Sequence, residues 1–147
     1  MTAKRIVLIV VAFALVIGVS SAVHLSRSAF GNVKAANSEA DSFLIALQKH
    51  DYNSAYSMMT PQTQENAPPN ALQGLQQMME KRYGLITKQP DTTNWFINYY
   101  KNITTIRFIY TISFQKHPIP LYIVMMKGQG IWRVQAFHYM QLTSDSK

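Results

Sequence analysis

The chain has 147 residues, 48% of them hydrophobic, with a formal net charge of +7 and no cysteine. This length suits one domain with an appendage, and the missing cysteine excludes disulfides, thiolate catalysis and thiol-ligated zinc. After residue 35 the basic residues are scattered, and only Lys81 and Arg82 are adjacent. The clustered basic patch that is typical of a nucleic-acid-binding protein is therefore missing from the sequence.

Residues 6–23 form an apolar segment after a short basic stretch that contains Lys4 and Arg5. A helix of about 18 residues, at ~1.5 Å per residue, reaches about 27 Å, close to the ~30 Å hydrocarbon core of a bilayer. We therefore predict a transmembrane anchor or a signal peptide over residues 1–25. Lys4 and Arg5 favour a cytoplasmic N-terminus, which places the rest of the chain outside the cytoplasm.

Two interpretations of this segment remain open. The unbroken run of Val and Ile favours a retained anchor, which predicts a single-pass protein of the bacterial inner membrane with a periplasmic domain. Small residues over 20–22 instead allow cleavage after Ala22, which would release a secreted or periplasmic protein. An exported domain without disulfides is more typical of a bacterial envelope than of animal secretion.

Residues 26–35 are expected to form a polar connector, and residues 36–142 a single folded domain. We place Ser38 as the N-cap of its first helix, with Asp41 in the capping-box position. Apolar residues at helical spacing mark the buried face of this helix: Ala36, Ala40, Phe43, Leu44 and Leu47.

Two more helices are predicted before residue 85. The first is capped by Asp51 and ends at Pro61. The second opens at Pro68-Pro69 and ends at Gly84, a residue that suits a C-terminal cap. Its inward-facing residues are predicted to be Leu72, Leu75, Met78 and Met79.

Beyond Gly84 the sequence favours strands. Residues 95–100 are rich in aromatic side chains, and residues 103–115 alternate, with one apolar face. Residues 121–126 are continuously apolar and predict a central strand. After a turn at residues 128–130, residues 131–140 return antiparallel. The apolar face of the alternating strand contains Ile106, Phe108, Tyr110, Ile112 and Phe114.

The predicted fold class is α+β. An N-terminal membrane helix is followed by about three helices packed on a curved antiparallel sheet of three or four strands. Residues 143–147 are polar and are expected to form a flexible tail.

Two short motifs resemble the nuclear-transport-factor-like superfamily, a cystatin-like α+β cone. Phe43 and Leu47 followed by Asp51-Tyr52-Asn53-Ser54-Ala55-Tyr56 are similar to its opening motif. The segment Gly130-Ile131-Trp132-Arg133-Val134 is similar to the motif on its last strand. The resemblance covers residues 36–140 and is strongest to small, functionally unassigned bacterial members that follow a signal or anchor.

The resemblance implies a sheet that curls around helices to make a cone. Some members of the superfamily are isomerases, cyclases or dehydratases with an Asp or His inside the cone, and others only bind or assemble. Membrane-anchored relatives include periplasmic scaffold subunits of secretion machines. Because motifs of this kind report on fold better than on activity, the site residues decide between these functions.

The sequence gives little support to catalysis or to metal binding. All seven carboxylates are expected on helices, caps, loops or the tail, and none on a strand. His138 is the one histidine predicted on a strand, sharing a face with Trp132, Val134 and Met140. No His-x-His or His-x-x-x-His pair suggests a metal site, and we predict no catalytic residue, metal or cofactor.

The aromatic side chains are the stronger functional signal. Most are expected in the core, but a half-open cone lined by aromatic rings could hold an apolar ligand or a side chain of a partner. The leading hypothesis is a non-enzymatic, membrane-tethered domain that binds a protein partner or assembles with itself. The alternatives are an apolar small-molecule or lipid site and, third, an isomerase- or cyclase-like enzyme using His138. The candidate ligand-binding residues are Trp95, Tyr110, Tyr122, Trp132 and His138.

Overall fold

The computed structural model describes residues 29–87 and 90–140, which form an α+β fold with four helices and one four-stranded antiparallel sheet. The chain divides into two units, residues 1–34 and 35–147. The predicted anchor over residues 6–23 and the predicted tail over residues 143–147 lie outside the described residues. Within the described part of the chain, no helix is long and apolar enough to cross a membrane.

The helix over residues 29–48 runs through Ser38 without interruption. The predicted N-cap at Ser38 is therefore wrong, and residues 29–35 of the predicted connector are helical. Alanine is the best helix former, and Ala35, Ala36 and Ala40 favour continuation of the helix across this point. The Ser38 carbonyl is an acceptor inside the helix, where it receives the Ser42 hydroxyl at 2.9 Å.

Three further helices follow: α2 (Tyr52–Ser57), α3 (Pro61–Asn66) and α4 (Pro69–Tyr83). The predicted cap of α2 is confirmed, since the Asp51 side chain accepts from the Ser54 amide at 3.1 Å. Helix α3 was not predicted. Pro61 does not end α2 but occupies the first turn of α3, where a missing amide proton costs nothing, and Thr60 caps that helix.

Helix α4 begins and ends as predicted. Its C-cap, Gly84, has a φ of +83°, and a Cβ there would lie 2.5 Å from a side-chain oxygen of Gln115. This position therefore requires glycine. The predicted inward face holds for Leu72 and Met79, which are buried, but it is wrong for Met78, which is 57% exposed.

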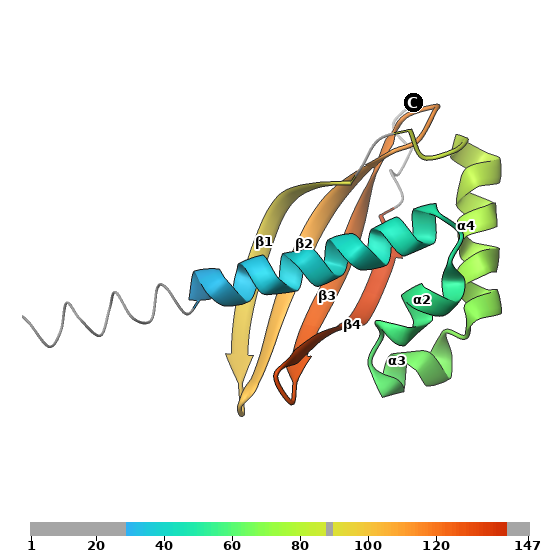
Figure 1. The fold of residues 1–147 in the computed structure, drawn as a ribbon. Helices are drawn as coiled ribbons and strands as arrows, with labels where there is room; N and C mark the ends of the chain where they lie inside the picture. Colours follow the sequence, from blue (N-terminus) through green and yellow to red (C-terminus); the bar gives the residue numbers. More distant parts are fainter. Residues whose placement is uncertain (1–28, 88–89, 141–147) are drawn as a thin grey trace, which may run out of the picture. The chain divides into compact units, whose positions relative to one another are not determined.

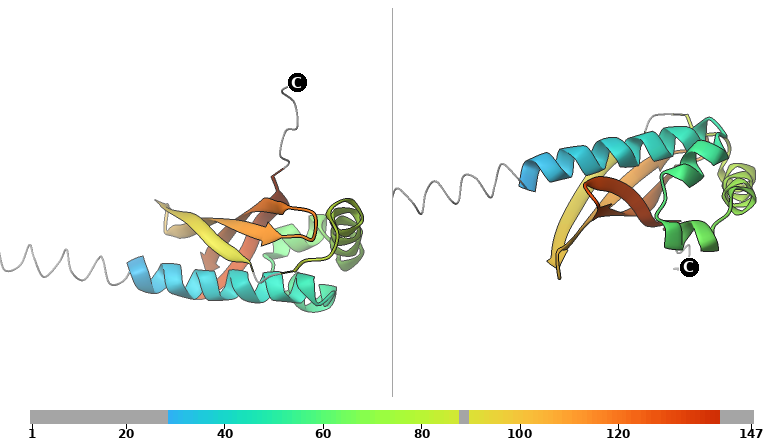
Figure 2. Two further views of the ribbon diagram at one scale, coloured as in Figure 1. Left: turned by 90° about the horizontal axis from the view of Figure 1, so that it is seen from above. Right: turned by 60° about the horizontal axis from the view of Figure 1, so that its bottom comes forward.

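The sheet contains β1 (Asp91–Tyr100), β2 (Ile103–Ser113), β3 (Pro118–Gly128) and β4 (Ile131–Tyr139) in this spatial order. Each strand is antiparallel to its neighbours, and β3 is internal as predicted. Figures 1 and 2 show that the strands twist and bend, that residues 35–48 of the long helix lie across one face, and that α2, α3 and α4 gather near β4. We call the face that carries the buried residues of β2 the inner face.

The core lies between this inner face and the helices. Along β2 every second side chain is buried, as predicted, because successive side chains of a strand point to opposite faces. Phe43 of the long helix packs edge-on against Phe137 of β4 with ring centroids 5.0 Å apart. The other large core side chains include Leu44, Leu47, Met59, Ile106, Phe108, Tyr110, Ile112, Leu121, Ile123 and Met125.

The two edges of the sheet differ. The β4 edge is covered around Val134, because the Thr60 amide donates to the Val134 carbonyl and the Val134 amide to the Met58 carbonyl, both at 2.9 Å. Thr63 of α3 adds a hydroxyl bond of 2.7 Å to the carbonyl of Gln135. By contrast, within the described residues β1 pairs with β2 alone. A long edge left open in this way is a template for pairing with another chain.

A bulge in β4 changes which side chains share a face. The register with β3 shifts between Val134 and Ala136, so that Gln135 is an extra residue. Trp132 and Val134 before the bulge are buried, whereas His138 after it is exposed and pairs with Tyr122. The expectation that His138 shares a face with Trp132 and Val134 is therefore wrong.

Candidate functional site

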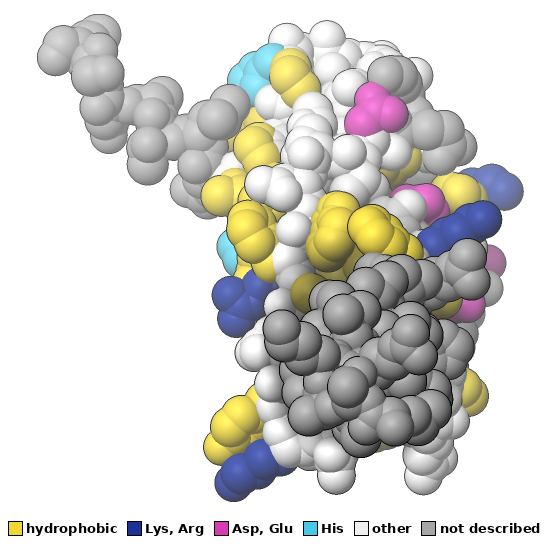
Figure 3. All heavy atoms as spheres, turned by 90° about the vertical axis from the view of Figure 1, so that its left-hand side faces the viewer, with side chains coloured by type: hydrophobic (Ala, Val, Ile, Leu, Met, Phe, Trp, Pro, Cys, Tyr) yellow, Lys and Arg dark blue, Asp and Glu magenta, His cyan; other side chains and the backbone are white. Residues whose placement is uncertain are grey.

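Strand β1 exposes an unusual amount of aromatic surface. Nine of its ten residues are exposed, and Ile97 is half-buried. Four aromatic side chains are between 39% and 63% exposed, which exceeds the scattered single exposures of an ordinary surface. Figure 3 views the molecule from the side where β1 lies in Figure 1, and hydrophobic side chains are visible there with Lys and Arg at the margins. We define the β1 surface as Trp95, Phe96, Ile97, Tyr99 and Tyr100.

The β1 surface has two faces. Trp95 lies opposite Phe108 of β2 and Ile97 opposite Ile106, so both belong to the inner face. Phe96 lies opposite Arg107 and belongs to the outer face. Apolar groups on both faces of a strand are typical of a strand buried on both sides, and β1 therefore has the composition of an internal strand at an exposed edge.

The backbone of β1 also presents hydrogen-bonding groups to the open edge. The Trp95 amide donates to the side-chain oxygen of Asn94 at 2.8 Å and so points away from β2. Because these groups alternate along an antiparallel strand, the amides of Ile97 and Tyr99 face the same way. A bulge at Thr93, whose hydroxyl binds the Ile109 carbonyl at 2.9 Å, limits the regular edge to the following residues.

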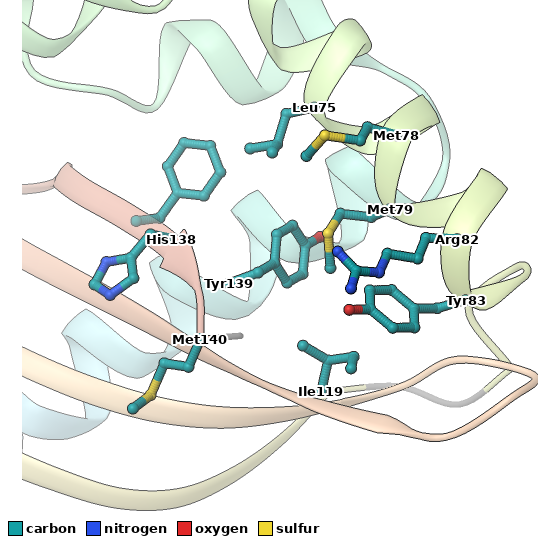
Figure 4. Close-up of a pocket in the computed structure, with 10 residues that line it drawn as sticks. Leu75, Met78, Met79, Arg82, Tyr83, Ile119, His138, Tyr139 and Met140 are labelled. Atoms are coloured by element: carbon teal, nitrogen blue, oxygen red, sulfur yellow. The ribbon is translucent and has the colours of Figure 1, made fainter. Parts of the chain in front are cut away.

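A separate cavity of about 210 Å³ lies between α4 and the ends of β3 and β4. Figure 4 shows Leu75, Met78 and Met79 on its α4 side, facing Tyr139 and Ile119 of the sheet. The Arg82 side chain points from α4 toward the rings of Tyr83 and Tyr139, whereas the imidazole of His138 points away from them (Figure 4). The cavity is thus largely apolar, and a guanidinium lies beside it.

Basic side chains lie beside this cavity near Tyr83. The Arg82 guanidinium lies 5.3 Å from the centre of the Tyr83 ring. Lys116 donates to the Arg82 carbonyl at 2.9 Å, and the His117 ring lies 5.0 Å from that of Tyr83. No carboxylate lines the cavity among the described residues. Its charge therefore suits a ligand with an apolar body and an anionic end.

A polar cluster joins the long helix to the sheet. The Tyr110 hydroxyl lies 3.0 Å from Asp41 Oδ1 and 3.1 Å from Asn37 Oδ1. Asn37 donates to Asp41 Oδ2 at 2.9 Å, and Thr92 donates to Asn37 at 2.8 Å. Burial raises the pKa of Asp41 above its usual value, and the hydrogen bond from Tyr110 opposes this shift. Burial also raises the pKa of Tyr110.

A second polar cluster joins α4 to β4. The buried Tyr139 hydroxyl donates to Gln76 Oε1 at 3.1 Å, and Gln76 donates to Glu80 Oε1 at 2.9 Å. His50 Nε2 lies 2.9 Å from the same Glu80 oxygen. Burial raises the pKa of Tyr139, and the charge of Glu80 adds to this effect. Every polar atom named here has a partner, as expected of a cluster that stabilises the fold.

The five candidate residues do not meet in one site. Tyr122 and His138 contact each other on the outer face, with ring centroids 5.0 Å apart. Tyr110 is fully buried, and Trp132 is 5% exposed with an indole nitrogen that has no hydrogen-bond partner among the residues that the structure describes. Trp95 lies on the edge strand. Of the five, only His138 is among the residues that line the cavity described above.

The prediction about acidic residues holds only in part. Asp91 is the first residue of β1, although no carboxylate was expected on a strand. Asp41, expected in a capping box, instead reaches Tyr110 of β2. The sequence shows that Asp41 lies near the buried helix residues Ala40 and Phe43. It does not show that Asp41 contacts Tyr110 on the sheet. In the described part of the chain no three His, Asp or Glu residues form a group that could hold a metal ion.

The comparisons with known proteins add no assignment. No protein-family model matches the sequence, and a comparison with curated proteins gives no significant match.

Proposed function

We propose that this chain is a membrane-tethered, extracytoplasmic domain of the nuclear-transport-factor-like superfamily that acts by binding protein rather than by catalysis. The exposed aromatic strand β1, open at the edge of the sheet, is the observation that carries this proposal. The apolar segment over residues 6–23 supports the tether and the periplasmic location, and the motifs at residues 43–56 and 130–134 support the superfamily.

Protein binding fits β1 better than a small ligand does. Aromatic side chains are enriched at the centres of protein interfaces, where they bury a large area at low entropic cost. An extended segment of a partner that adds to an open sheet edge also gains main-chain hydrogen bonds. Trp95 and Tyr99 supply the first kind of contact, and the outward amides of Ile97 and Tyr99 supply the second.

Site-specific photocrosslinking in intact cells tests this function. A photoreactive amino acid is placed at Tyr99 in the full-length chain, and at the exposed Lys49, just after the long helix, as the matched control. We expect discrete protein adducts from Tyr99 and none from Lys49. If Tyr99 gives no adduct while the protein is present and folded, β1 is not a binding surface and the proposal fails.

The cavity beside α4 favours a second candidate function, the binding of a small apolar molecule. Its volume of about 210 Å³ is enough for one ring or a short acyl chain, since a dry cavity of about 150 Å³ holds benzene. Met78 and Met140 are both partly exposed at the cavity, and flexible methionines of this kind adapt to different ligands.

Thermal unfolding of the full-length chain with hexanoate, and with hexanol as the neutral counterpart, tests this second candidate. We expect hexanoate to raise the melting temperature more than hexanol does, because Arg82 lies at the cavity. The Arg82→Gln variant should lose the difference, and the exposed neighbour Lys81→Gln should keep it. No effect of either ligand on the unaltered protein would rule this candidate out, and equal effects of the two ligands would contradict the role given to Arg82.

A further inference from the structure

We propose that the protein that binds β1 is a second copy of this chain, paired antiparallel to it about a twofold axis at Phe96. The two sheets would then form one continuous sheet of eight strands. This inference rests on the proposed function and names the partner for the same surface. It depends on three properties of β1: its charges, its order of side chains and its open backbone groups.

The charges of β1 are self-complementary. Between its first residue, Asp91, and the residue after its end, Lys101, the strand carries no charged side chain. An antiparallel arrangement centred on Phe96 brings the end of β1 that carries Asp91 near the end of the other copy that carries Lys101, with the bulge at Thr93 shifting the register by one residue before Asp91. Opposite charges at both ends favour this arrangement, whereas a parallel one would place like charges together.

The apolar side chains match in the same register. Phe96 of each copy faces its equivalent on the outer face, and Trp95 of one copy faces Ile97 of the other on the inner face. Aromatic pairs and aromatic–β-branched pairs are among the stabilising cross-strand pairs of antiparallel sheets. Arg107 lies one strand further in on each copy, so the two guanidinium groups are separated by about 14 Å, a distance at which salt screens their repulsion.

The backbone groups also match. The amides of Trp95 and Ile97 point to the open edge. In this register Trp95 of one copy lies opposite Ile97 of the other, so that the outward-pointing backbone groups of the two strands face each other. The Trp95 amide would exchange the Asn94 side chain for a carbonyl of the second copy. Because the proposed contact is twofold and uses β1 of both copies, it closes after two copies and does not extend into a fibre.

Disulfide trapping tests this arrangement, because the chain has no cysteine of its own. Phe96→Cys in the full-length chain places two thiols across the proposed axis. The two residues form a non-hydrogen-bonded pair, the type of antiparallel pair in which the side chains lie closest together. Mixed expression of Asn94→Cys and Asn98→Cys tests the same register with all aromatic residues intact. Ile131→Cys, at a residue that is 56% exposed on the far hairpin, is the control.

After mild oxidation in intact cells we expect covalent dimers from Phe96→Cys and from the Asn94/Asn98 mixture, and monomers from Ile131→Cys. Monomers from both test sets would overturn self-pairing. If the photoreactive probe at Tyr99 then still gives adducts with a different protein, β1 binds protein and only the identity of the partner is wrong. If that probe is also silent, the proposed function fails with it.

Charge reversal separates self-pairing from pairing with another protein. Asp91→Lys alone and Lys101→Asp alone each place like charges at both ends of the pair and should reduce the yield of the Phe96→Cys dimer. The double variant restores opposite charges between copies and should recover the yield. No recovery of the dimer yield in the double variant would contradict the pairing of the charged ends of β1 between two copies.

Discussion

The hydroxyl of Tyr110 on β2 lies 3.0 Å from a carboxylate oxygen of Asp41 on the long helix. Tyr110 is fully buried, and Asp41 is only partly exposed. The contact joins the helix to the inner face of the sheet, and the two residues are 69 positions apart in sequence. The acid therefore links the helix to the sheet, and each of its two oxygens accepts a hydrogen bond, one from Tyr110 and the other from Asn37.

Replacing Tyr110 by phenylalanine should destabilise the domain. The change removes the donor for Asp41 and Asn37 while filling almost the same volume, so we expect the free energy of unfolding to fall by about 1–2 kcal/mol. Denaturant unfolding of the two proteins measures this difference. Tyr122→Phe, a change on the half-buried outer face, should have little effect, and an equal loss in both variants would contradict the assigned role.

The pH dependence of stability should reveal Asp41. An acid whose pKa is raised on folding binds its proton more tightly in the folded state, so its contribution is most favourable at low pH. That contribution is lost as the pH rises from the ordinary value of 3.8 through the raised pKa. Asp51 has a lowered pKa because of its hydrogen bonds with Ser54 and acts in the opposite direction. The difference in unfolding free energy between the unaltered chain and Asp41→Asn isolates the contribution of Asp41. This difference should decrease as the pH rises from 3.8 through the raised pKa of Asp41. A difference that increases with pH would show that the carboxylate form is the one the fold favours.

The Tyr139 hydroxyl should contribute to stability through Gln76. Gln76 is 1% exposed, and in Tyr139→Phe its side-chain oxygen would lose the hydrogen bond that the structure provides. Leaving a buried acceptor unpaired costs about 1–3 kcal/mol, and denaturant unfolding should show a loss of this size. Adding Gln76→Met removes the unpaired acceptor and should recover part of it. No loss in the single variant would mean that the hydroxyl bond is not formed in solution.

Two adjacent methionines of α4 should respond differently to truncation. Met79 is 6% exposed, and Met79→Ala leaves a cavity that should cost about 2–4 kcal/mol. Met78 is 57% exposed, and Met78→Ala should change the free energy by less than about 0.5 kcal/mol. Thermal or denaturant unfolding of both variants compares them directly. Similar losses would mean that α4 is rotated relative to the arrangement described above.

The apolar segment should be retained in the mature protein. We expect a protein that still contains residues 6–23 and remains in the membrane fraction after alkaline washing, because these residues suit a retained anchor. Mass spectrometry of the protein purified from its own cells makes this measurement. A mature protein that starts at Val23 would instead identify the segment as a cleaved signal.

Much of the fold could be predicted because it depends on local signals. The alternation of β2, the turn at Gly128–Gly130, the cap at Asp51 and the glycine at residue 84 are each visible within a few residues of sequence. Pro61 was misinterpreted because proline both ends helices and opens them, and only the Thr60 side chain, which accepts from Thr63, distinguishes the two cases.

The candidate site could not be predicted to the same extent, because it depends on the two bulges and on long-range contacts. One extra residue at Gln135 moves His138 to the other face of the sheet, and nothing in the sequence marks that position. Likewise, the aromatic composition of β1 resembles that of a core strand. That β1 is an exposed edge follows only from the order of the four strands.

The number of chains per particle tests the central claim most directly. Light scattering of the full-length chain, extracted in detergent and corrected for the detergent mass, should give two chains for the unaltered protein. Phe96→Lys puts a charge at the proposed axis and should give one chain, whereas Ile131→Lys on the far hairpin should still give two. A single chain for the unaltered protein, or two chains for Phe96→Lys, would contradict pairing through β1.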